Sequence, residues 1–200
     1  MDDIVLRGMA KWPNVPAVYD WAALDRRGNW LIKGERVLNP NVVAFIGRNY
    51  DHDDQGRWFF QNGPQRVFVA LDYTPFVYRV TSGGNAPLTM ESHTGQPVTN
   101  VTGAWLDEDG ALLVEAESGI GVVNDLDLDR VCRYFVDADG HPPNDDMLAE
   151  SMELLQRQRR APLWLSFHGL NRKIEPIKSG EVPRRFGFVS RPAPLAGGTP

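Results

Sequence analysis

A four-residue turn pattern recurs along the chain and constrains the fold more than any other feature of the sequence. Aspartate begins and glycine ends each copy, at residues 25–28, 53–56, 107–110 and 137–140. An aspartate side chain can accept a hydrogen bond from the backbone two residues further on, and glycine can adopt the positive φ that closes the turn. Each copy therefore predicts a tight reversal, and the flanking residues place three of the four between strands.

The flanks of the first and third copies also agree. A leucine precedes each aspartate (Leu24 and Leu106), and two aliphatic residues follow each glycine after the same spacing, at 31–32 and 113–114. We interpret this as the same type of β-hairpin formed at two places in the chain, because the residue preferences of the turn are enough to generate such a pattern. An ancestral duplication is the alternative.

Asparagine residues mark the starts of two predicted helices. Asn39 precedes Pro40, and this pair favours a helix start because Asn accepts hydrogen bonds from unpaired amides while Pro at the first position loses no needed donor. Apolar residues at helical spacing extend this helix to about residue 48. Asn144 predicts the cap of a second helix that runs to about residue 159. A third helix is expected at residues 128–135, after aspartates that suit a helix N-terminus.

The remaining regular segments predict strands. Three strands follow Gly56, separated by turn residues, and predict a meander; they lie at residues 58–61, 65–71 and 76–81. The polar stretch 81–97, broken by Gly and Pro, predicts a loop. A hairpin is expected at residues 101–117. Three closing strands are expected at residues 163–167, 173–177 and 186–189.

These segments predict an α+β protein of two lobes, in which antiparallel hairpins and a meander pack with a few short helices. The N-terminal lobe comprises residues 1–82 and the C-terminal lobe residues 98–190. Residues 191–200, rich in Pro and Gly, are expected to form a flexible tail.

Length and composition are those of a soluble, compact protein. With 200 residues, of which 42% are apolar, the chain can bury a core. Its start, Met1-Asp2-Asp3, lacks the features of a signal peptide, and no apolar run approaches the roughly 18 residues needed to cross a bilayer. The single cysteine, Cys132, cannot form an intramolecular disulfide. We therefore expect a cytoplasmic location and no membrane partner.

Charge is distributed unevenly. The net charge of −5 argues against a general nucleic-acid binder, because phosphate attraction dominates such binding. Residues 101–156 contain fourteen acidic residues and two arginines, whereas residues 157–191 contain nine basic residues and two glutamates. The basic region could steer an anionic ligand. The favoured interpretation is that the two surfaces face one another within the fold or across a homodimer.

Residues 20–80 carry a series of short motifs in a fixed order. The series is Asp25-x-x-Gly28-Asn29-Trp30, Gly34, a helix with Phe45, Asp53-x-x-Gly56-Arg57-Trp58, Pro64-x-Arg66-Val67 and Asp72-x-x-Pro75-Phe76. It resembles DUF1285, a proteobacterial family of domains of unknown function. The resemblance implies a bacterial, two-lobed α+β protein with no assigned activity, for which ligand binding or signalling is suggested by shape. Where that family favours a Glu-Lys pair, this chain has Gln65-Arg66.

No common catalytic signature occurs in the sequence. It contains no Gly-x-Ser-x-Gly elbow, Walker loop, dinucleotide fingerprint or His-Glu-x-x-His. The alternating aspartates at residues 125–129 resemble a calcium loop, but Arg130 and Val136 occupy the positions that need Gly and Glu. The four histidines lack the spacing of metal ligands, and His52, among three aspartates, predicts a solvated turn. We therefore predict no catalytic residue, no metal site and no cofactor.

Aromatic residues interleaved with arginines offer the best candidate ligand site. Arg66 is the candidate anchor for negative charge, and Trp58 and Tyr78 are candidates for an apolar wall. The family resemblance places a pocket near Gln65, Arg66 and Asp72. A half-buried antiparallel sheet would explain the same alternation without any ligand.

The sequence favours a non-enzymatic binding or regulatory protein for a small anionic ligand. The alternative is a structural or interaction protein that dimerises or docks a partner through its basic C-terminal surface. The third hypothesis is a hydrolase with a dispersed site that involves His93 or His168.

Overall fold

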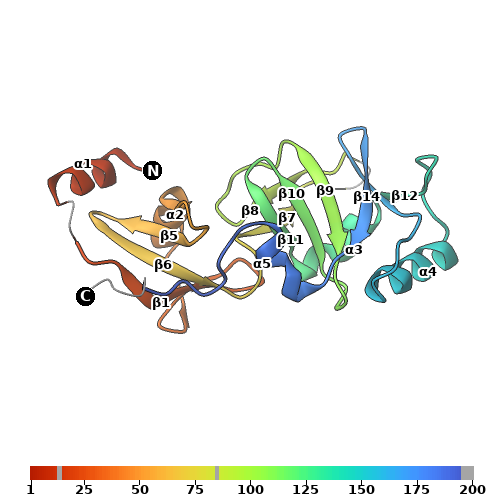
Figure 1. Cartoon of the computed structure of the whole chain (residues 1–200). Helices are drawn as coiled ribbons and strands as arrows, with labels where there is room; N and C mark the ends of the chain where they lie inside the picture. Colours follow the sequence, from red (N-terminus) through yellow and green to blue (C-terminus); the bar gives the residue numbers. More distant parts are fainter. Residues whose placement is uncertain (13–14, 84–85, 195–200) are drawn as a thin grey trace. The chain divides into compact units, whose positions relative to one another are not determined.

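The computed structural model describes residues 1–12, 15–83 and 86–194 (Figure 1). The chain divides into two compact units, of which unit 1 is Met1–Pro75 with Pro183–Pro200 and unit 2 is Phe76–Val182. The described residues form five short α-helices and fourteen strands in two mixed sheets. The predicted α+β class is therefore confirmed, with strands predominating. No helix in the described part of the chain is long and apolar enough to cross a bilayer.

Unit 1 contains a six-stranded sheet in the order β3-β2-β1-β6-β5-β4. Strands β1 and β6 pair in parallel, and the other neighbours are antiparallel. Helix α2 begins as predicted, because the Asn39 side chain accepts hydrogen bonds from the Asn41 and Val42 amides. The elements are α1 (Asp3–Lys11), β1 (Val18–Leu24), β2 (Trp30–Ile32), β3 (Glu35–Arg36), α2 (Pro40–Arg48), β4 (Tyr50–His52), β5 (Trp58–Asn62) and β6 (Gln65–Leu71).

Unit 2 contains an eight-stranded sheet in the order β12-β13-β14-β9-β10-β11-β7-β8. The pairs β14·β9 and β11·β7 are parallel. Asn144 caps α4 by accepting a hydrogen bond from the Met147 amide, as predicted. The elements are β7 (Phe76–Val80), β8 (Met90–Ser92), β9 (Val101–Leu106), β10 (Leu112–Ala116), β11 (Gly119–Val123), α3 (Leu128–Cys132), β12 (Phe135–Val136), α4 (Asp145–Gln156), β13 (Trp164–Phe167), β14 (Leu170–Pro176) and α5 (Val182–Arg185), with short 3-10 turns at Asp125–Asp127 and Ser179–Glu181.

All four predicted turns form, and they share one set of hydrogen bonds. In each, one oxygen of the aspartate side chain accepts from the backbone amides two and four residues further on, and the glycine amide donates to the aspartate carbonyl. The four glycines have φ between 71° and 84°. Three of the turns connect the strand pairs β1–β2, β4–β5 and β9–β10, and the fourth leads from β12 towards α4. The prediction of three interstrand turns is confirmed.

The predicted three-stranded meander is wrong, although its three strands exist. Strands β5 and β6 pair in unit 1, whereas β7 pairs with β8 and β11 in unit 2. The reason lies in β11, where two glycines leave room for rings on β7. A Cβ on Gly121 would lie 2.4 Å from the Tyr78 ring, and one on Gly119 would lie 3.2 Å from the Phe76 ring.

Three other predictions of secondary structure need correction. Residues 186–189 form no strand, because Gly187 has a φ of 68° and only Val189 bridges to Arg57. The predicted loop at 81–97 contains β8. The helix expected at residues 128–135 ends at Cys132, and Phe135 belongs to β12. Residues 84–85, and residues 195–200 of the expected tail, lie outside the described residues.

The last described residues return to the sheet of unit 1, where Figure 1 draws them in blue beside β1 and β6. The Val189 amide donates to the Gly56 carbonyl, and the Leu71 amide donates to the Ser190 carbonyl. Phe188, which precedes these two residues, is buried. The C-terminal segment is thus part of the same packed unit as the N-terminal strands.

Candidate functional site

One face of the sheet in unit 1 gathers two arginines, two phenylalanines and a glutamine. Phe59 of β5 lies opposite Phe68 of β6, and Gln61 lies opposite Arg66. Arg57, two residues before Phe59, projects to the same side because side chains alternate along a strand. Polar and aromatic groups from two adjacent strands therefore meet on one surface.

A cavity of about 470 Å³ opens on this face, and we call it the Arg66 cavity. It is lined by residues of α1, of the segment that leads into β1, and of β1, β5 and β6. The lining residues are Met9, Trp12, Val15, Ala17, Tyr19, Arg57, Gln61, Pro64, Arg66 and Phe68. Two of them are cations and none is a carboxylate, so the lining favours an anion.

The two arginines differ in their partners. The Arg57 guanidinium lies 4.7 Å from the Phe68 ring centroid and forms an ion pair with Asp53, with 2.7 Å between Nη2 and Oδ2. The Arg66 guanidinium lies 4.1 Å from the Phe59 centroid, and no carboxylate pairs with it among the described residues. Arg57 is therefore compensated locally, and Arg66 supplies the uncompensated positive charge of the cavity.

The turn before β5 fixes the Arg57–Asp53 pair. Burial by itself would raise the pKa of Asp53, but hydrogen bonds from the Arg57 side chain, the Arg57 amide and the Gln55 amide hold that pKa below its ordinary value. The carboxylate therefore stays ionised at neutral pH and keeps Arg57 in place over Phe68.

Gln61 is one of the residues of this site that sequence reasoning missed, as are Trp12 and Tyr19. The Gln61 side chain is only 2% exposed, and its Nε2 donates to the Gly63 carbonyl at 3.1 Å. Its Oε1 is buried and accepts no hydrogen bond from any described residue. Such a group costs about 1–3 kcal/mol if left unsatisfied. The sequence does carry a signal for Gln61. It is a polar residue directly after three aromatic residues, and it lies two positions after Phe59, so both side chains project to the same face of the sheet.

Residues from the N-terminal part of unit 1 complete the wall. Tyr19 stacks on Phe68, with ring centroids 4.6 Å apart and planes within 10°. Gln65 Nε2 donates to the Pro16 carbonyl at 3.3 Å, between the lining residues Val15 and Ala17. Trp12, at the end of α1, lines the cavity and is 58% exposed. The wall thus offers aromatic surface beside the two guanidinium groups.

The structure brings together only part of the predicted ligand site. Arg66 lines the Arg66 cavity, whereas the neighbouring Gln65 is not among its described lining residues. Asp72 lines a second cavity of about 250 Å³ in unit 1. Trp58 projects from β5 to the opposite face, where its ring lies 4.8 Å from that of Tyr50. Trp58 therefore does not line the Arg66 cavity.

Tyr78 belongs to unit 2, where it is fully buried. Its hydroxyl donates to the Gly119 carbonyl at 2.7 Å and lies 2.9 Å from the Ser118 hydroxyl. Burial, more than any other cause, raises the pKa of Tyr78 to about 12. These contacts describe a tyrosine held in the core of unit 2.

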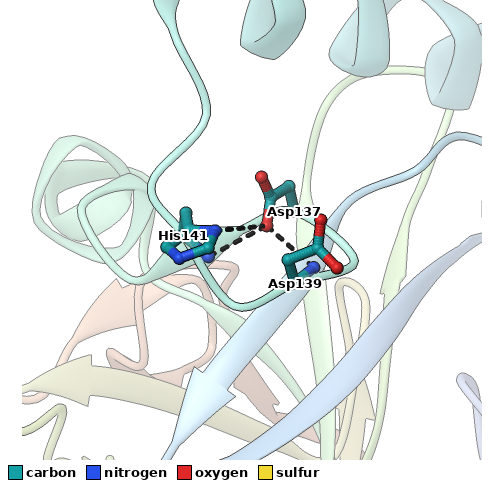
Figure 2. A group of neighbouring side chains, drawn as sticks. All are labelled: Asp137, Asp139 and His141. Carbon is teal, nitrogen blue, oxygen red and sulfur yellow. Dashed lines mark hydrogen bonds and ion pairs between the residues drawn. The ribbon is translucent and has the colours of Figure 1, made fainter.

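The described residues also contain one group with the composition of a metal site, Asp137, Asp139 and His141 (Figure 2). Their ligand atoms lie within 4.8 Å of one another, and the His141 Nδ1 is 3.9 Å from the Asp137 Oδ1. In all four turns the aspartate, the second residue after it and the fourth residue after it lie close together. They do so because the aspartate Oδ1 accepts hydrogen bonds from the backbone amides of the other two residues. The turn itself therefore explains this proximity, and two of the three residues are exposed.

Some residues of the basic region form ion pairs inside unit 2. Arg157 pairs with Glu153 at 2.6 Å, and Arg160 pairs with Glu175 at 3.4 Å. Glu108 accepts hydrogen bonds from the amide and hydroxyl of Ser179. Only the first of these pairs, among the described residues, joins the acidic region to the basic region, because Glu175 belongs to the basic region itself. That the two surfaces face one another therefore stays a prediction.

Comparison with known proteins places these observations in a family context. A family model described as "Protein of unknown function (DUF2946)" matches residues 1–193. The structure of a DUF1285 family protein from Silicibacter pomeroyi DSS-3 is similar, with 17% identity, a TM-score of 0.53, and coverage of 86% of this chain and 87% of that chain. That likeness confirms the predicted resemblance at the level of fold.

A DUF1285 family protein from Shewanella baltica OS155 is also similar, with 15% identity and a TM-score of 0.43, over 55% of this chain and 88% of that chain. No curated protein matches the chain.

Proposed function

The chain belongs to the DUF2946 family of proteins of unknown function, and on that premise we propose that it is a binding protein that takes a small anionic ligand in the Arg66 cavity. The observation that carries the proposal is an arginine without a carboxylate partner, in a cavity with no acidic lining residue, both statements made of the described residues. A half-buried guanidinium favours an anionic partner because water screens its charge only in part.

The preorganisation of the site supports the same function. Arg66 and Arg57 rest on the Phe59 and Phe68 rings, which are themselves in edge contact with centroids 5.8 Å apart. Guanidinium groups held on aromatic rings lose less side-chain freedom when a ligand binds. The two arginines therefore support recognition of a carboxylate or a similar planar anion.

Native mass spectrometry of the freshly purified full chain is the first test of this proposal. Release of a small anion after unfolding would support it and supply the ligand for titration. A charge-assisted hydrogen bond contributes about 1.5–3 kcal/mol, so Arg66→Gln should weaken binding of that anion by roughly tenfold or more.

Arg36→Gln is the matched control, because Arg36 is an exposed residue of edge strand β3 in the same unit. It removes the same charge from unit 1 and should leave the affinity unchanged. Equal affinity of wild type and Arg66→Gln, with both proteins folded by circular dichroism, would exclude the Arg66 cavity as the binding site.

A further inference from the structure

The arginines and aromatic side chains of the Arg66 cavity specify its ligand more closely, and we infer that the cavity takes an aromatic monocarboxylate. This inference rests on the proposed function, since it names the class of anion that the same cavity accepts. It is carried by the hydrogen-bond donors of Arg66, by the charge balance of the two arginines and by the exposed ring of Trp12.

Arg66 offers hydrogen-bond donors as well as charge. Its guanidinium carbon lies over the Phe59 ring, 4.1 Å from the ring centroid. An aromatic ring attracts the charge but takes only weak hydrogen bonds from the N–H groups. Within the described residues, no oxygen accepts a hydrogen bond from this guanidinium. A carboxylate is planar and can accept two of the donors side by side, so it suits this group.

Charge balance favours a single negative charge. The donors of Arg57 are used within the protein: Nε and Nη2 contact the Asp53 carboxylate at 2.8 and 2.7 Å, and Nη1 donates to the Ala193 carbonyl at 3.4 Å. Among the described lining residues, Arg66 contributes the only other positive charge. A dianion would bring a second negative charge that the described lining does not compensate, and an unpaired charge in a partly buried site is costly. A monocarboxylate matches the charge of Arg66.

Trp12 supplies aromatic surface for the rest of the ligand. The Phe59 and Phe68 rings already carry the two guanidinium groups, and Tyr19 stacks on Phe68. Trp12 lines the same cavity and is 58% exposed. Coverage of its ring by an aromatic group would remove apolar surface from water and allow offset or edge-to-face packing. An aromatic substituent should therefore bind better than a saturated one of similar size.

Helix α1 holds Trp12 at the cavity. Val5 is buried beneath the helix, and a Cβ on Gly8 would lie 3.4 Å from the backbone of Gly63 and Pro64, between β5 and β6. The Trp12 amide donates to the Gly8 carbonyl at 3.0 Å. The tryptophan thus extends from a helix that is packed closely on the strands of the cavity, so little ordering of its backbone is needed when a ligand binds.

Isothermal titration calorimetry of the full chain with three probes tests the inference. The probes are 3-phenylpropanoate, 3-cyclohexylpropanoate and 2-phenylethylphosphonate. The two carboxylates have the same charge and similar apolar surface, and differ in aromatic character. The phosphonate keeps the phenyl ring and is a dianion in alkaline buffer. 3-Phenylpropanoate should bind about two- to tenfold more tightly than the cyclohexyl acid, as expected for an aromatic pair, and more tightly than the phosphonate.

Variants separate the aromatic contact from the charge interaction. Trp12→Leu keeps an apolar side chain and removes the ring, so the affinity for 3-phenylpropanoate should fall to that for the cyclohexyl acid. Trp21→Leu is the matched control, because Trp21 is 50% exposed in the same unit but lines the second cavity. It should leave both affinities unchanged. Arg66→Gln should weaken both carboxylates alike, by about tenfold or more.

The outcomes distinguish this inference from the proposed function. Equal binding of the two carboxylates to the wild type, with loss of both in Arg66→Gln, would overturn the inference and leave the proposed function standing. Binding of neither would also overturn it, and the anion released from the purified protein would then decide the proposed function on its own. Thermal unfolding identifies any variant that fails to fold, and the comparison of probes on the wild type does not depend on the variants.

Two further outcomes would overturn single parts of the inference. An unchanged preference for 3-phenylpropanoate in Trp12→Leu would show that the ligand ring lies elsewhere. Tighter binding of the phosphonate would refute the argument from charge balance and indicate Lys11, whose Nζ lies 5.7 Å from the Trp12 ring centroid, as a second cationic partner.

Discussion

The backbone around Gly56 leaves no room for a side chain. The substitution Gly56→Ala therefore tests how the C-terminal segment packs in unit 1. A Cβ at this position would lie 2.0 Å from the Gly187 carbonyl oxygen and 3.0 Å from the Phe188 Cα. Both contacts involve backbone of the C-terminal segment, so no side-chain rotation can relieve them. The substitution should displace residues 187–190 from the β4–β5 turn.

The expected cost follows from what that displacement breaks. Positive φ at a residue with a side chain costs about 1–2 kcal/mol. Loss of the Val189–Gly56 and Leu71–Ser190 hydrogen bonds adds about 0.5–1.5 kcal/mol each. Exposure of Phe188, now 6% exposed, adds roughly 1.5–3 kcal/mol. The free energy of unfolding of unit 1 should fall by about 4 kcal/mol or more.

Gly34→Ala is the matched control. Gly34 has a φ of 83°, in the same region as the 71° of Gly56, but a Cβ there meets no atom within 4 Å. It should cost only the strain of about 1–2 kcal/mol. Urea unfolding followed by tryptophan fluorescence measures both variants, and hydrogen exchange of residues 183–194 measures the displacement. Similar stabilities of the two variants, with the Val189 amide still protected in Gly56→Ala, would refute this account of the packing.

Three further predictions concern titration and capping. Because burial raises the pKa of Tyr78 to about 12, the folded state holds this proton more tightly than the unfolded state. The stability that it contributes is present below pH 10 and is lost as pH rises towards 12, by about 2–3 kcal/mol; Tyr78→Phe should lose correspondingly less in denaturant titrations over that range, and parallel curves would contradict the assignment. The depressed pKa of Asp53 has the opposite sign, so its contribution is present above about pH 4 and is lost as pH falls through the folded-state pKa. Asp53→Asn should flatten the acid limb of the stability curve, and an unchanged acid limb would count against the ion pair with Arg57. Asn144→Ala removes the cap of α4 and should destabilise unit 2 by about 0.5–2 kcal/mol; thermal unfolding that matches the wild type would show that the cap contributes nothing.

Local chemistry explains why several elements could be predicted from the sequence. The aspartate and the glycine of each turn make their hydrogen bonds within five residues, so the four copies fold alike in both units. The caps of α2 and α4 are equally local. None of these features depends on what else the chain contacts.

The candidate site was predicted only in part. Which side chains meet on one face of a sheet depends both on alternation along each strand and on which strands pair, and the sequence alone does not show the pairing. Arg66 was identified from charge among aromatic residues. Gln61 was missed, since the burial of its side chain depends on the pairing of β5 with β6. Trp58 was assigned to the same site, yet a strand directs neighbouring side chains to opposite faces.

By itself, therefore, the sequence determined the α+β class, the four turns, two capped helices and most strands, because these arise from hydrogen bonds and periodicities a few residues long. The tertiary structure alone decided that β7 joins β11 rather than β6, that residues 183–194 pack with the N-terminal strands, and that Arg57, Gln61 and Arg66 meet in one cavity. These arrangements depend on the space that glycines leave for side chains of a neighbouring strand, and on pairing between strands that are far apart in the sequence. A pattern a few residues long contains neither kind of information.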